Sequence, residues 1–327
     1  MRAIQAREAG GPEVLELVQL PDPAPGVGEV LVESAAAGLN FIDTYRRAGV
    51  YPVPFPHVPG SEGAGVVTAI GAGVTDLAIG DRIAWSDAPA SYAELVAVRA
   101  SRALPVPDEV ALDVAAALPL QGLTAHYLVT STYPVREGDF VLVHAGAGGV
   151  GLLLTQLATA RGAQVITTVS TGEKEELSRA AGAVAVIRYD QLDDLTTQLP
   201  PLVRDASHGG VAVAYDGVGR ATFDASLASI RRRGMLVLFG GSSGQVPPFD
   251  LQRLNAAGSL YVTRPTLGDY TVTTDELRGR SDELFAAVAA GTLDVRIGAR
   301  FPLSEAAAAH RALEGRATTG KVILELA

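Results

Sequence analysis

The chain has 327 residues, of which 26 are lysine or arginine and 36 are aspartate or glutamate, so its formal net charge is −10. This balance argues against nonspecific binding to nucleic acids or anionic membranes, because the overall field repels phosphate groups. The absence of cysteine excludes disulfides, thiolate nucleophiles and Cys-ligated metal sites, and the five histidines are too scattered for a paired metal-ligand motif.

The N-terminal sequence MRAIQAREAGGPEV carries charges where a secretory signal would need an apolar core. We therefore expect a cytoplasmic protein. The most apolar run begins at Val141, but glycines, His144 and Gln156 interrupt it. A buried strand, turn and helix are predicted there instead of a membrane span.

Short strands separated by turns rich in glycine and proline are predicted up to about residue 105. They are the segments VLELVQL, EVLVESAAAGL, GAGVVTAIG, DRIAWS and SYAELVAVRA. This spacing is typical of a compact antiparallel barrel or sandwich. The loop that begins YPVPFPHVPG at Tyr51 contains four prolines, which exclude a regular helix or a central strand.

From about residue 108, helices alternate with apolar strands. Helices are predicted at 108–130, 148–162 and 173–183, and strands at 139–144, 164–170 and 211–219. A helix that begins at Phe223 is expected to end in the solvated arginines of RRRG, before a strand at MLVLFGG. Such alternation predicts a doubly wound parallel sheet with helices on both faces.

After about residue 265 the pattern changes again. A helix is predicted from Thr274 to Ala290, a strand at VRIGARFPL, a helix from Ser304 to Leu313 and a final strand at KVILEL. We expect this segment to return to the first domain. The predicted domains are therefore 1–122 together with 265–327, and 123–264.

A glycine-rich turn is the most specific motif. Gly146, Gly148 and Gly151 fit GxGxxG, follow a predicted strand and open a predicted helix. Such glycines let the turn tighten and let backbone N–H groups approach a pyrophosphate, whose charge the helix N-terminus stabilises. The motif predicts a dinucleotide site, and His144 just before it is interpreted as structural.

The end of the next strand indicates which dinucleotide binds. An NAD site usually places an acidic side chain about 20 residues after the turn, but here the strand ends with Ser170 and Thr171. Lys174 follows one helical turn later and is available to a 2′-phosphate, with Glu173 beside it. We therefore expect NADPH. The alternative is that Lys174 is a solvated residue at the start of a helix.

The order of these segments resembles the medium-chain dehydrogenase/reductase superfamily, and within it the quinone oxidoreductases related to zeta-crystallin. The resemblance covers essentially the whole chain. Its markers are GGPEVL, AAAGLNFIDTYRRAGVYP, GSEGAGVV, QGLTAHYL, HAGAGGVG, YDGVG, RRGMLVLFGGSSG, GSLYVTRPTL and RATTGK. It implies an α/β protein with a GroES-like β-barrel catalytic domain, in which a Rossmann cofactor domain with a doubly wound parallel sheet is inserted.

The resemblance also implies catalysis without a metal. Zinc-dependent relatives have a cysteine at the position of Asn40 and a histidine at the position of Ser61. The implied activity is that of a zinc-independent NADPH:quinone oxidoreductase, with the quinone bound in the cleft between the domains. A quinone needs less polarisation than an alcohol or a simple carbonyl, because hydride addition gives a delocalised hydroquinone anion.

The resemblance assigns a set of site residues. The implied cofactor contacts are Asn40, Phe41, Asp43, Tyr45, Tyr127, Gly146, Gly148, Gly149, Val150, Gly151, Ser170, Lys174, Tyr189, Val218, Phe239, Gly240, Ser242, Ser243 and Arg316. The members of this set that surround the 2′-phosphate are Ser170, Lys174, Tyr189 and Arg316. The candidates for the substrate site are Asn40, Tyr45, Tyr51, Gln121 and Arg264, and no catalytic acid or base is assigned.

Several of these assignments have alternatives. Tyr45 and Tyr51 alternatively pack between the domains, and Arg264 alternatively forms a salt bridge at the domain boundary. Gln121 stands where some relatives have a lysine, and Gly241 replaces a common asparagine. These two departures bear on substrate preference more than on cofactor binding.

Two other functions remain open. One is the NADPH-dependent reduction of the double bond of an alkenal or enone on the same scaffold. The other is nucleotide binding with little catalysis, in a crystallin-like or RNA-binding protein, although the charge of −10 and the few aromatic residues disfavour RNA. An exposed sheet edge near Met235 and GSLYVTRPTL also favours a homodimer.

Overall fold

The computed structural model describes residues 1–326 and contains two compact units. The first unit comprises Met1–Leu123 and Thr273–Ala327, and the second comprises Thr124–Val272. The chain therefore passes from one unit to the other after Leu123 and after Val272, whereas the predicted boundaries follow residues 122 and 264. Within residues 1–326, no helix is both long enough and apolar enough to cross a membrane.

The first unit contains a seven-stranded sheet and a separate two-stranded one. The larger sheet has the order β14 (Ile297–Pro302), β15 (Lys321–Glu325), β3 (Glu29–Leu39), β4 (Glu62–Ile70), β5 (Arg82–Trp85) and β7 (Leu104–Pro105), with β6 (Leu95–Arg99) also paired to β3. The smaller sheet joins β1 (Arg2–Ala6) to β2 (Leu15–Gln19) in antiparallel register. β1 is absent from the predicted strands, whereas β3 has the predicted bounds.

The long strand β3 organises this sheet. Along one side it pairs antiparallel with β4, and along the other it pairs first with β6 and then with β15. Alternate residues of these strands point inward, so that Val30, Val32, Val67, Val96 and Trp85 form one apolar core. The predicted GroES-like, mainly antiparallel fold is thus confirmed.

The helices of the first unit include α1 (Phe41–Arg47), α2 (Leu112–Ala117), α9 (Thr274–Ala289) and α10 (Ala306–Glu314). The single helix predicted at 108–130 is wrong. It is divided into α2, α3 (Pro119–Tyr127) and a wider helical turn at Leu128–Thr132. Pro119 lacks a backbone N–H, so it starts a new helix instead of continuing α2.

The second unit is a six-stranded parallel sheet. Its order is β10 (Ala185–Arg188), β9 (Gln164–Val169), β8 (Phe140–Val143), β11 (Val211–Asp216), β12 (Ile230–Leu238) and β13 (Tyr261–Thr263). The predicted Rossmann-type parallel sheet is confirmed.

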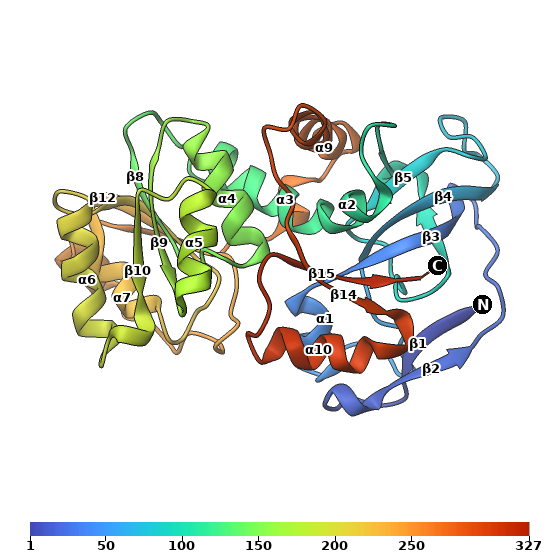
Figure 1. Cartoon of the computed structure of the whole chain (residues 1–327), viewed down its shortest axis with the longest axis horizontal. Helices are drawn as coiled ribbons and strands as arrows, with labels where there is room; N and C mark the ends of the chain where they lie inside the picture. Colours follow the sequence, from blue (N-terminus) through green and yellow to red (C-terminus); the bar gives the residue numbers. More distant parts are fainter. Residues whose placement is uncertain (327) are drawn as a thin grey trace. The chain divides into compact units, whose positions relative to one another are not determined.

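Helices cover both faces of this parallel sheet, as Figure 1 shows. On one face lie α4 (Gly149–Thr159) and α5 (Gly172–Ala180), and on the other lie α6 (Leu195–Ala206) and α7 (Phe223–Ala228). The second face packs Leu142 and Ile166 of the strands against Leu199 and Phe223 of the helices. Because both faces are buried, the strands read as continuous apolar runs.

The arginines after α7 are not the end of a helix, so that interpretation was wrong. The helix ends at Ala228, and β12 begins two residues later at Ile230. The parallel ladder pairs Val211 with Ile230 and then Val213 with Met235, so residues 231–234 are looped out of register. This bulge exposes the arginines to solvent, where Arg231 pairs with Asp139 at 3.2 Å.

Candidate active site

The glycine turn lies at the carboxyl end of β8 and opens α4. A Cβ on Gly151 would lie 2.2 Å from the carbonyl oxygen of Ala145, and a Cβ on Gly146 would lie 2.6 Å from Thr167. These two positions therefore admit only glycine. Gly148 is different, because its Cβ would lie 3.2 Å from the Ala145 oxygen and would otherwise face open space. The space beside Gly148 and the N-terminus of α4 fits an anionic pyrophosphate.

His144 fixes the turn through a buried hydrogen-bond chain. Its Nδ1 lies 2.9 Å from Thr168 Oγ1 and its Nε2 lies 2.8 Å from Ser226 Oγ. Ser226 in turn donates to the buried carboxylate of Asp216, which also accepts from the N–H groups of residues 218 and 219. Burial lowers the pKa of His144. The imidazole is thus a neutral structural bridge between the end of β9 and α7.

The carboxyl end of β9 carries the predicted phosphate-binding side chains. Thr171 caps the N-terminus of α5, and its Oγ1 accepts a hydrogen bond from the backbone N–H of Lys174 at 3.3 Å. The Lys174 ammonium lies 3.4 Å from Ser170 Oγ. The cap thus holds Lys174 and Ser170 side by side at a helix N-terminus, which is a favourable place for a phosphate.

Arg188 is a second cation at this place that the sequence analysis missed. It ends β10, whose register pairs it with Val169 at the end of β9. Its guanidinium lies 3.6 Å from the position that a Cβ on Gly172 would take, and it pairs with Asp190 at 2.6 Å. Tyr189 follows directly in a short 3-10 turn. Only the sheet register, which adds β10 next to β9, brings Arg188 to this end.

The loops after β11 and β12 interlock beside the turn. Ser243 donates from its N–H and its hydroxyl to the carbonyl oxygen of Val218, each at 2.8 Å. The N–H of Ser242 donates to Gly217 at 3.3 Å, and Phe239 packs against Gly217. Together with Gly240, these predicted residues lie at the carboxyl ends of adjacent parallel strands, which is where doubly wound sheets bind ligands.

A pair of tyrosines stacks within the parallel-sheet unit. The rings of Tyr127 and Tyr270 lie 4.3 Å apart and nearly parallel, at 9°. Burial raises the pKa of Tyr127, Tyr270 raises it further, and the positive charge of Arg264 opposes both. Arg264 follows β13 and is exposed. Tyr270 was missed because it comes from an irregular segment with no motif.

In the first unit, α1 carries the predicted aromatic residues. The rings of Phe41 and Tyr45 lie 6.3 Å apart, and Tyr51 meets Tyr45 edge to face at 5.6 Å. Tyr51 is 39% exposed, so this cluster presents aromatic surface. Such a cluster suits a flat conjugated ring.

Asp43 also belongs to α1 and is fully buried. Its Oδ2 accepts from the N–H of Asn40 at 2.9 Å and from the hydroxyl of Tyr92 at 3.1 Å. Burial raises the pKa of Asp43 to about 6, although the Asn40 N–H and the charge of Lys321 oppose the shift. Asp43 therefore fixes the start of α1, and its predicted contact with the cofactor stays a prediction.

Asn40 belongs to a buried network that the sequence analysis did not foresee. Its Oδ1 accepts from Lys321 Nζ at 2.8 Å, and its Nδ2 donates to Glu62 at 2.6 Å and to the Gly38 carbonyl at 3.4 Å. Lys321 and Glu62 also form an ion pair, and both are almost completely buried. Gln121 Nε2 makes a long contact to Asn40 Oδ1 at 3.5 Å.

The positions that the resemblance aligns with zinc ligands are unsuited to zinc. Asn40 contacts the Lys321 ammonium, and the Ser61 hydroxyl accepts a hydrogen bond from the Arg46 guanidinium. Two fixed cations at these positions would repel a third. Among residues 1–326, no group of three or more histidine, aspartate or glutamate side chains has the geometry to hold a metal ion.

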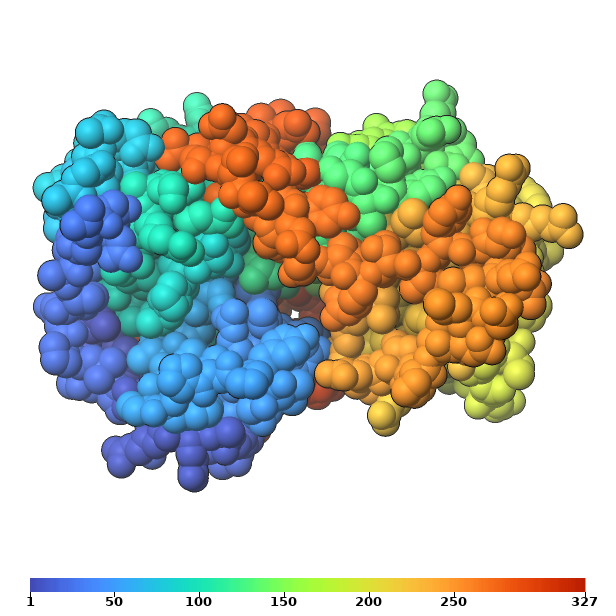
Figure 2. Space-filling model, turned by 180° about the vertical axis from the view of Figure 1, so that it is seen from behind, coloured from blue at the N-terminus to red at the C-terminus, as the bar shows by residue number. Residues whose placement is uncertain are grey.

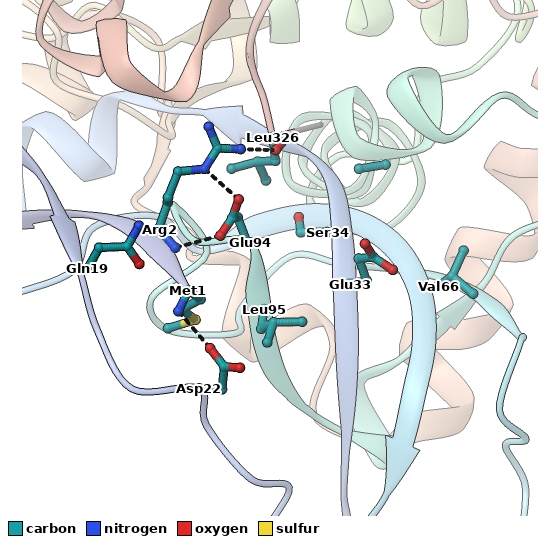
Figure 3. Close-up of a pocket in the computed structure, with 11 residues that line it drawn as sticks. Met1, Arg2, Gln19, Asp22, Glu33, Ser34, Val66, Glu94, Leu95 and Leu326 are labelled. Carbon is teal, nitrogen blue, oxygen red and sulfur yellow. Dashed lines mark hydrogen bonds and ion pairs between the residues drawn. The ribbon is translucent and has the colours of Figure 1, made fainter.

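A surface hollow of about 710 Å³ lies elsewhere in the first unit, at the N-terminus. Its lining contains none of the predicted site residues. Figure 3 shows two pairs among its charged groups, Arg2 with Glu94 and the Met1 ammonium with Asp22, each at 2.6 Å. We therefore assign the candidate site to the strand ends of the second unit and to the Asn40 region of the first.

The predicted residues are thus brought together in two groups. The second unit groups the glycine turn with the predicted phosphate-binding residues and with the loops after β11 and β12. The first unit groups Asn40, the aromatic residues of α1 and Gln121, and it also contains Arg316, which is exposed after α10. The residues that were missed are Glu62, Arg188, Tyr270 and Lys321. Only Glu62 and Lys321 had a signal, a charge beginning an apolar strand.

Known protein families match both halves of the sequence. The family described as "Alcohol dehydrogenase GroES-like domain" matches residues 26–108, and the family described as "Zinc-binding dehydrogenase" matches residues 149–279. The word "zinc-binding" in the second family description does not fit this chain at Asn40 and Ser61, because a cationic side chain contacts each of these two residues.

Relatives and solved structures match nearly the whole chain. The quinone oxidoreductase of Pseudomonas aeruginosa is 44% identical over 325 residues, 99% of each chain, and the 2-haloacrylate reductase of a Burkholderia species is 40% identical, with 96% of each chain covered. A mycobacterial protein solved with NADPH is 52% identical with a TM-score of 0.97, and Escherichia coli quinone oxidoreductase solved with NADPH is 41% identical with a TM-score of 0.96. Each solved structure and this chain cover 100% of one another.

Three findings lead to one assignment. They are the 44% identity to a quinone oxidoreductase along the full chain, the GroES-like unit joined to a Rossmann unit, and the cations that contact Asn40 and Ser61 at the positions of zinc ligands. The chain belongs to the zinc-free quinone oxidoreductases of the medium-chain dehydrogenase/reductase superfamily.

Proposed function

We propose that this chain reduces a quinone with NADPH and without a metal ion. The observation that carries the proposal is the pair of fixed cations, Lys321 and Arg46, at the positions of Asn40 and Ser61. A scaffold that has exchanged metal ligands for internal cations requires a substrate that accepts a hydride without a metal Lewis acid. A quinone meets this requirement because its reduction product is aromatic.

NADPH, when bound, supplies the hydride, and the chain supplies binding and orientation. The glycine turn and the N-terminus of α4 hold the pyrophosphate, while Lys174, Ser170 and Arg188 form a positive site for the 2′-phosphate. Tyr45 and Tyr51 offer aromatic surface to the quinone. The location of both rings between the domains stays a prediction, as does the contribution of Arg316.

The test is steady-state turnover of benzoquinone with NADPH and with NADH, before and after treatment with a chelator. We expect NADPH to be preferred at least tenfold and the chelator to have no effect. Activity that disappears with the chelator and returns with zinc would overturn the metal-free proposal. Any NADPH-dependent turnover also argues against a purely structural or RNA-binding protein.

Reduction of an activated double bond is the second candidate function. It is favoured by the 40% identity to the Burkholderia enzyme, whose name describes the reduction of 2-haloacrylate. The same preparation should therefore be assayed with an α,β-unsaturated aldehyde and with 2-chloroacrylate. If either is turned over far faster than benzoquinone, the double-bond reductase replaces the quinone reductase.

We also propose that the chain forms a homodimer through β13. This strand ends the parallel sheet, and its outer edge has no partner strand within residues 1–326. Tyr261 is 59% exposed and Val262 is 37% exposed on it, and Figure 2 shows this orange segment at the surface of its unit. An exposed apolar edge favours pairing with a second copy.

Sedimentation velocity tests this edge. The wild type is expected to sediment as a dimer at micromolar concentration and Tyr261→Glu as a monomer, while Val272→Glu, at an exposed valine outside β13, stays dimeric. A wild-type monomer would overturn the proposal. The cytoplasmic location remains a prediction from the sequence.

A further inference from the structure

The network around Asn40 places a buried ammonium group on one side of the Asn40 amide and a buried carboxylate on the other. Lys321 begins β15, Glu62 begins β4 and Asn40 follows β3, and the register of these strands brings the three side chains together. Lys321 is 1% exposed and Glu62 is fully buried. Glu62 also accepts from the N–H of Leu120 at 2.6 Å, so the network is anchored to the first turn of α3. Buried charges of this kind stay ionised only when they are paired and hydrogen-bonded.

The two charges determine how the Asn40 amide is oriented. An ammonium can only donate hydrogen bonds, so the atom of Asn40 beside Lys321 must be the oxygen. An ionised carboxylate can only accept, so the atom beside Glu62 must be the nitrogen. The remaining hydrogen of that nitrogen faces the Gly38 carbonyl. Asn40 is therefore saturated and has no free donor for a ligand.

The orientation is passed on to Gln121. Because Asn40 presents only an oxygen, Gln121 turns its amide nitrogen toward it. Gln121 Oε1 is left buried and without a hydrogen-bond partner in the part of the chain that the structure describes. A buried acceptor without a partner is destabilising, and such groups persist where a ligand or a water molecule completes them.

We propose that the buried Lys321–Glu62 pair is the positioning element of the substrate site, which sets Gln121 Oε1 as an acceptor for the O–H group of the reduced substrate. The inference rests on the proposed quinone reduction. A quinone oxygen can only accept hydrogen bonds, and it becomes an O–H donor after the quinone gains a hydride from NADPH and a proton from solvent. Gln121 Oε1 therefore favours the hydroquinone over the quinone. Gln121 is the residue that determines this specificity, and Lys321 and Glu62 act through it.

The experiment compares hydroquinone affinity with quinone affinity in a set of variants. The inhibition constant for hydroquinone and the Michaelis constant for benzoquinone are measured without oxygen for the wild type, Gln121→Met, Glu62→Gln/Lys321→Met and the triple variant. One neutral hydrogen bond corresponds to about fivefold in affinity. We expect Gln121→Met to raise the hydroquinone constant about fivefold and to leave the benzoquinone constant nearly unchanged. The double variant should show the same loss, and the triple variant no further loss.

A merely structural ion pair gives a different result. In that case the double variant keeps the wild-type inhibition constant for hydroquinone. Gln121→Met then raises this constant by the same factor in the wild type and in the double variant, and the proposal is overturned. Arg47→Met/Glu314→Gln is the matched control, because it removes another ion pair of the same unit with a buried arginine. Gln121→Met is expected to retain its full effect in that control.

A single substitution keeps the test decisive if the double variant does not fold. Gln121→Glu places a carboxyl group at the same position, and this group accepts more strongly once it is ionised, so hydroquinone binding should strengthen as the pH rises from about 5 to about 9, whereas the wild type should stay constant. A flat profile for Gln121→Glu would overturn the proposal. If the wild type itself does not oxidise NADPH with benzoquinone, it is the proposed function that fails, and this outcome is seen before any variant is made.

Discussion

The nucleotide-binding end and the Asn40 region are built in different ways. In the parallel-sheet unit, the candidate site consists mainly of backbone at the carboxyl ends of β8, β9, β11 and β12. In the first unit it consists of side chains that come from β3, β4, α3 and β15, far apart in sequence. A backbone site tolerates many side chains but few changes at glycine, whereas a side-chain network depends on the hydrogen-bonding groups of every member.

The largest effect is expected from breaking the buried charge pair. Lys321→Met leaves Glu62 buried and unpaired, which should lower the free energy of unfolding by about 3–5 kcal/mol. Glu62→Gln/Lys321→Met should recover most of this loss, because no isolated charge remains. Denaturant unfolding of the two variants measures the difference. Equal stability of Lys321→Met and the wild type would show that the pair is not essential to the fold.

The pH dependence of stability should separate two buried groups that act in opposite directions. Burial and the charge of Arg47 lower the pKa of His310 to about 3, while burial raises that of Asp43 to about 6. As the pH falls below 6.5, the unfolded chain protonates its histidine and the folded chain does not, so His310 destabilises the fold. As the pH falls through about 6, the folded chain protonates Asp43 first, so Asp43 stabilises it.

The variants should therefore diverge in acid. Between about pH 6 and pH 4, His310→Gln should gain, and Asp43→Asn should lose, about 1.4 kcal/mol per pH unit relative to the wild type. Urea unfolding at several pH values measures both slopes. Parallel curves for the two variants would contradict the assigned pKa directions.

Substitutions at two glycines of the same turn should have different effects, one on stability and the other on NADPH binding. Gly151→Ala places a Cβ 2.2 Å from a backbone oxygen and should cost about 1–3 kcal/mol of stability. Gly148→Ala meets only one close atom, at 3.2 Å, and should leave the melting temperature nearly unchanged. Its methyl group faces the space that we assign to the pyrophosphate, so the KM for NADPH should rise about tenfold, or about 1.4 kcal/mol. An unchanged KM would place the pyrophosphate elsewhere.

The smallest effect is expected at the 2′-phosphate. Lys174→Ala should raise the KM for NADPH about tenfold and leave the KM for NADH unchanged, because only NADPH carries the phosphate. Arg188→Ala should act in the same direction but more weakly, since Asp190 already pairs with Arg188. A loss that is equal for both cofactors would show that Lys174 serves the fold of α5 instead.

Local patterns were sufficient for much of the fold. The turns rich in glycine and proline delimited β3 at Glu29–Leu39, and the alternation of apolar strands with helices predicted the strand and the helix on either side of the GxGxxG turn. The errors arose where one residue overrode a pattern. Pro119 divides the helix predicted at 108–130, and the arginines after Ser229 are held in a bulge of β12 by the pairing of Val211 with Ile230.

The sequence by itself determined the parallel sheet, the nucleotide-binding turn and the lack of cysteine ligands, because each depends on residues that are neighbours in the chain. Only the tertiary structure decided that Lys321 lies on Asn40, that Arg46 lies on Ser61 and that Arg188 joins Lys174 at the strand ends. These pairs come from strand register and from long-range packing. The partner of a buried charge is whichever polar group the folded sheet brings within hydrogen-bonding distance. That distance depends on strand register, and no local pattern in the sequence predicts it.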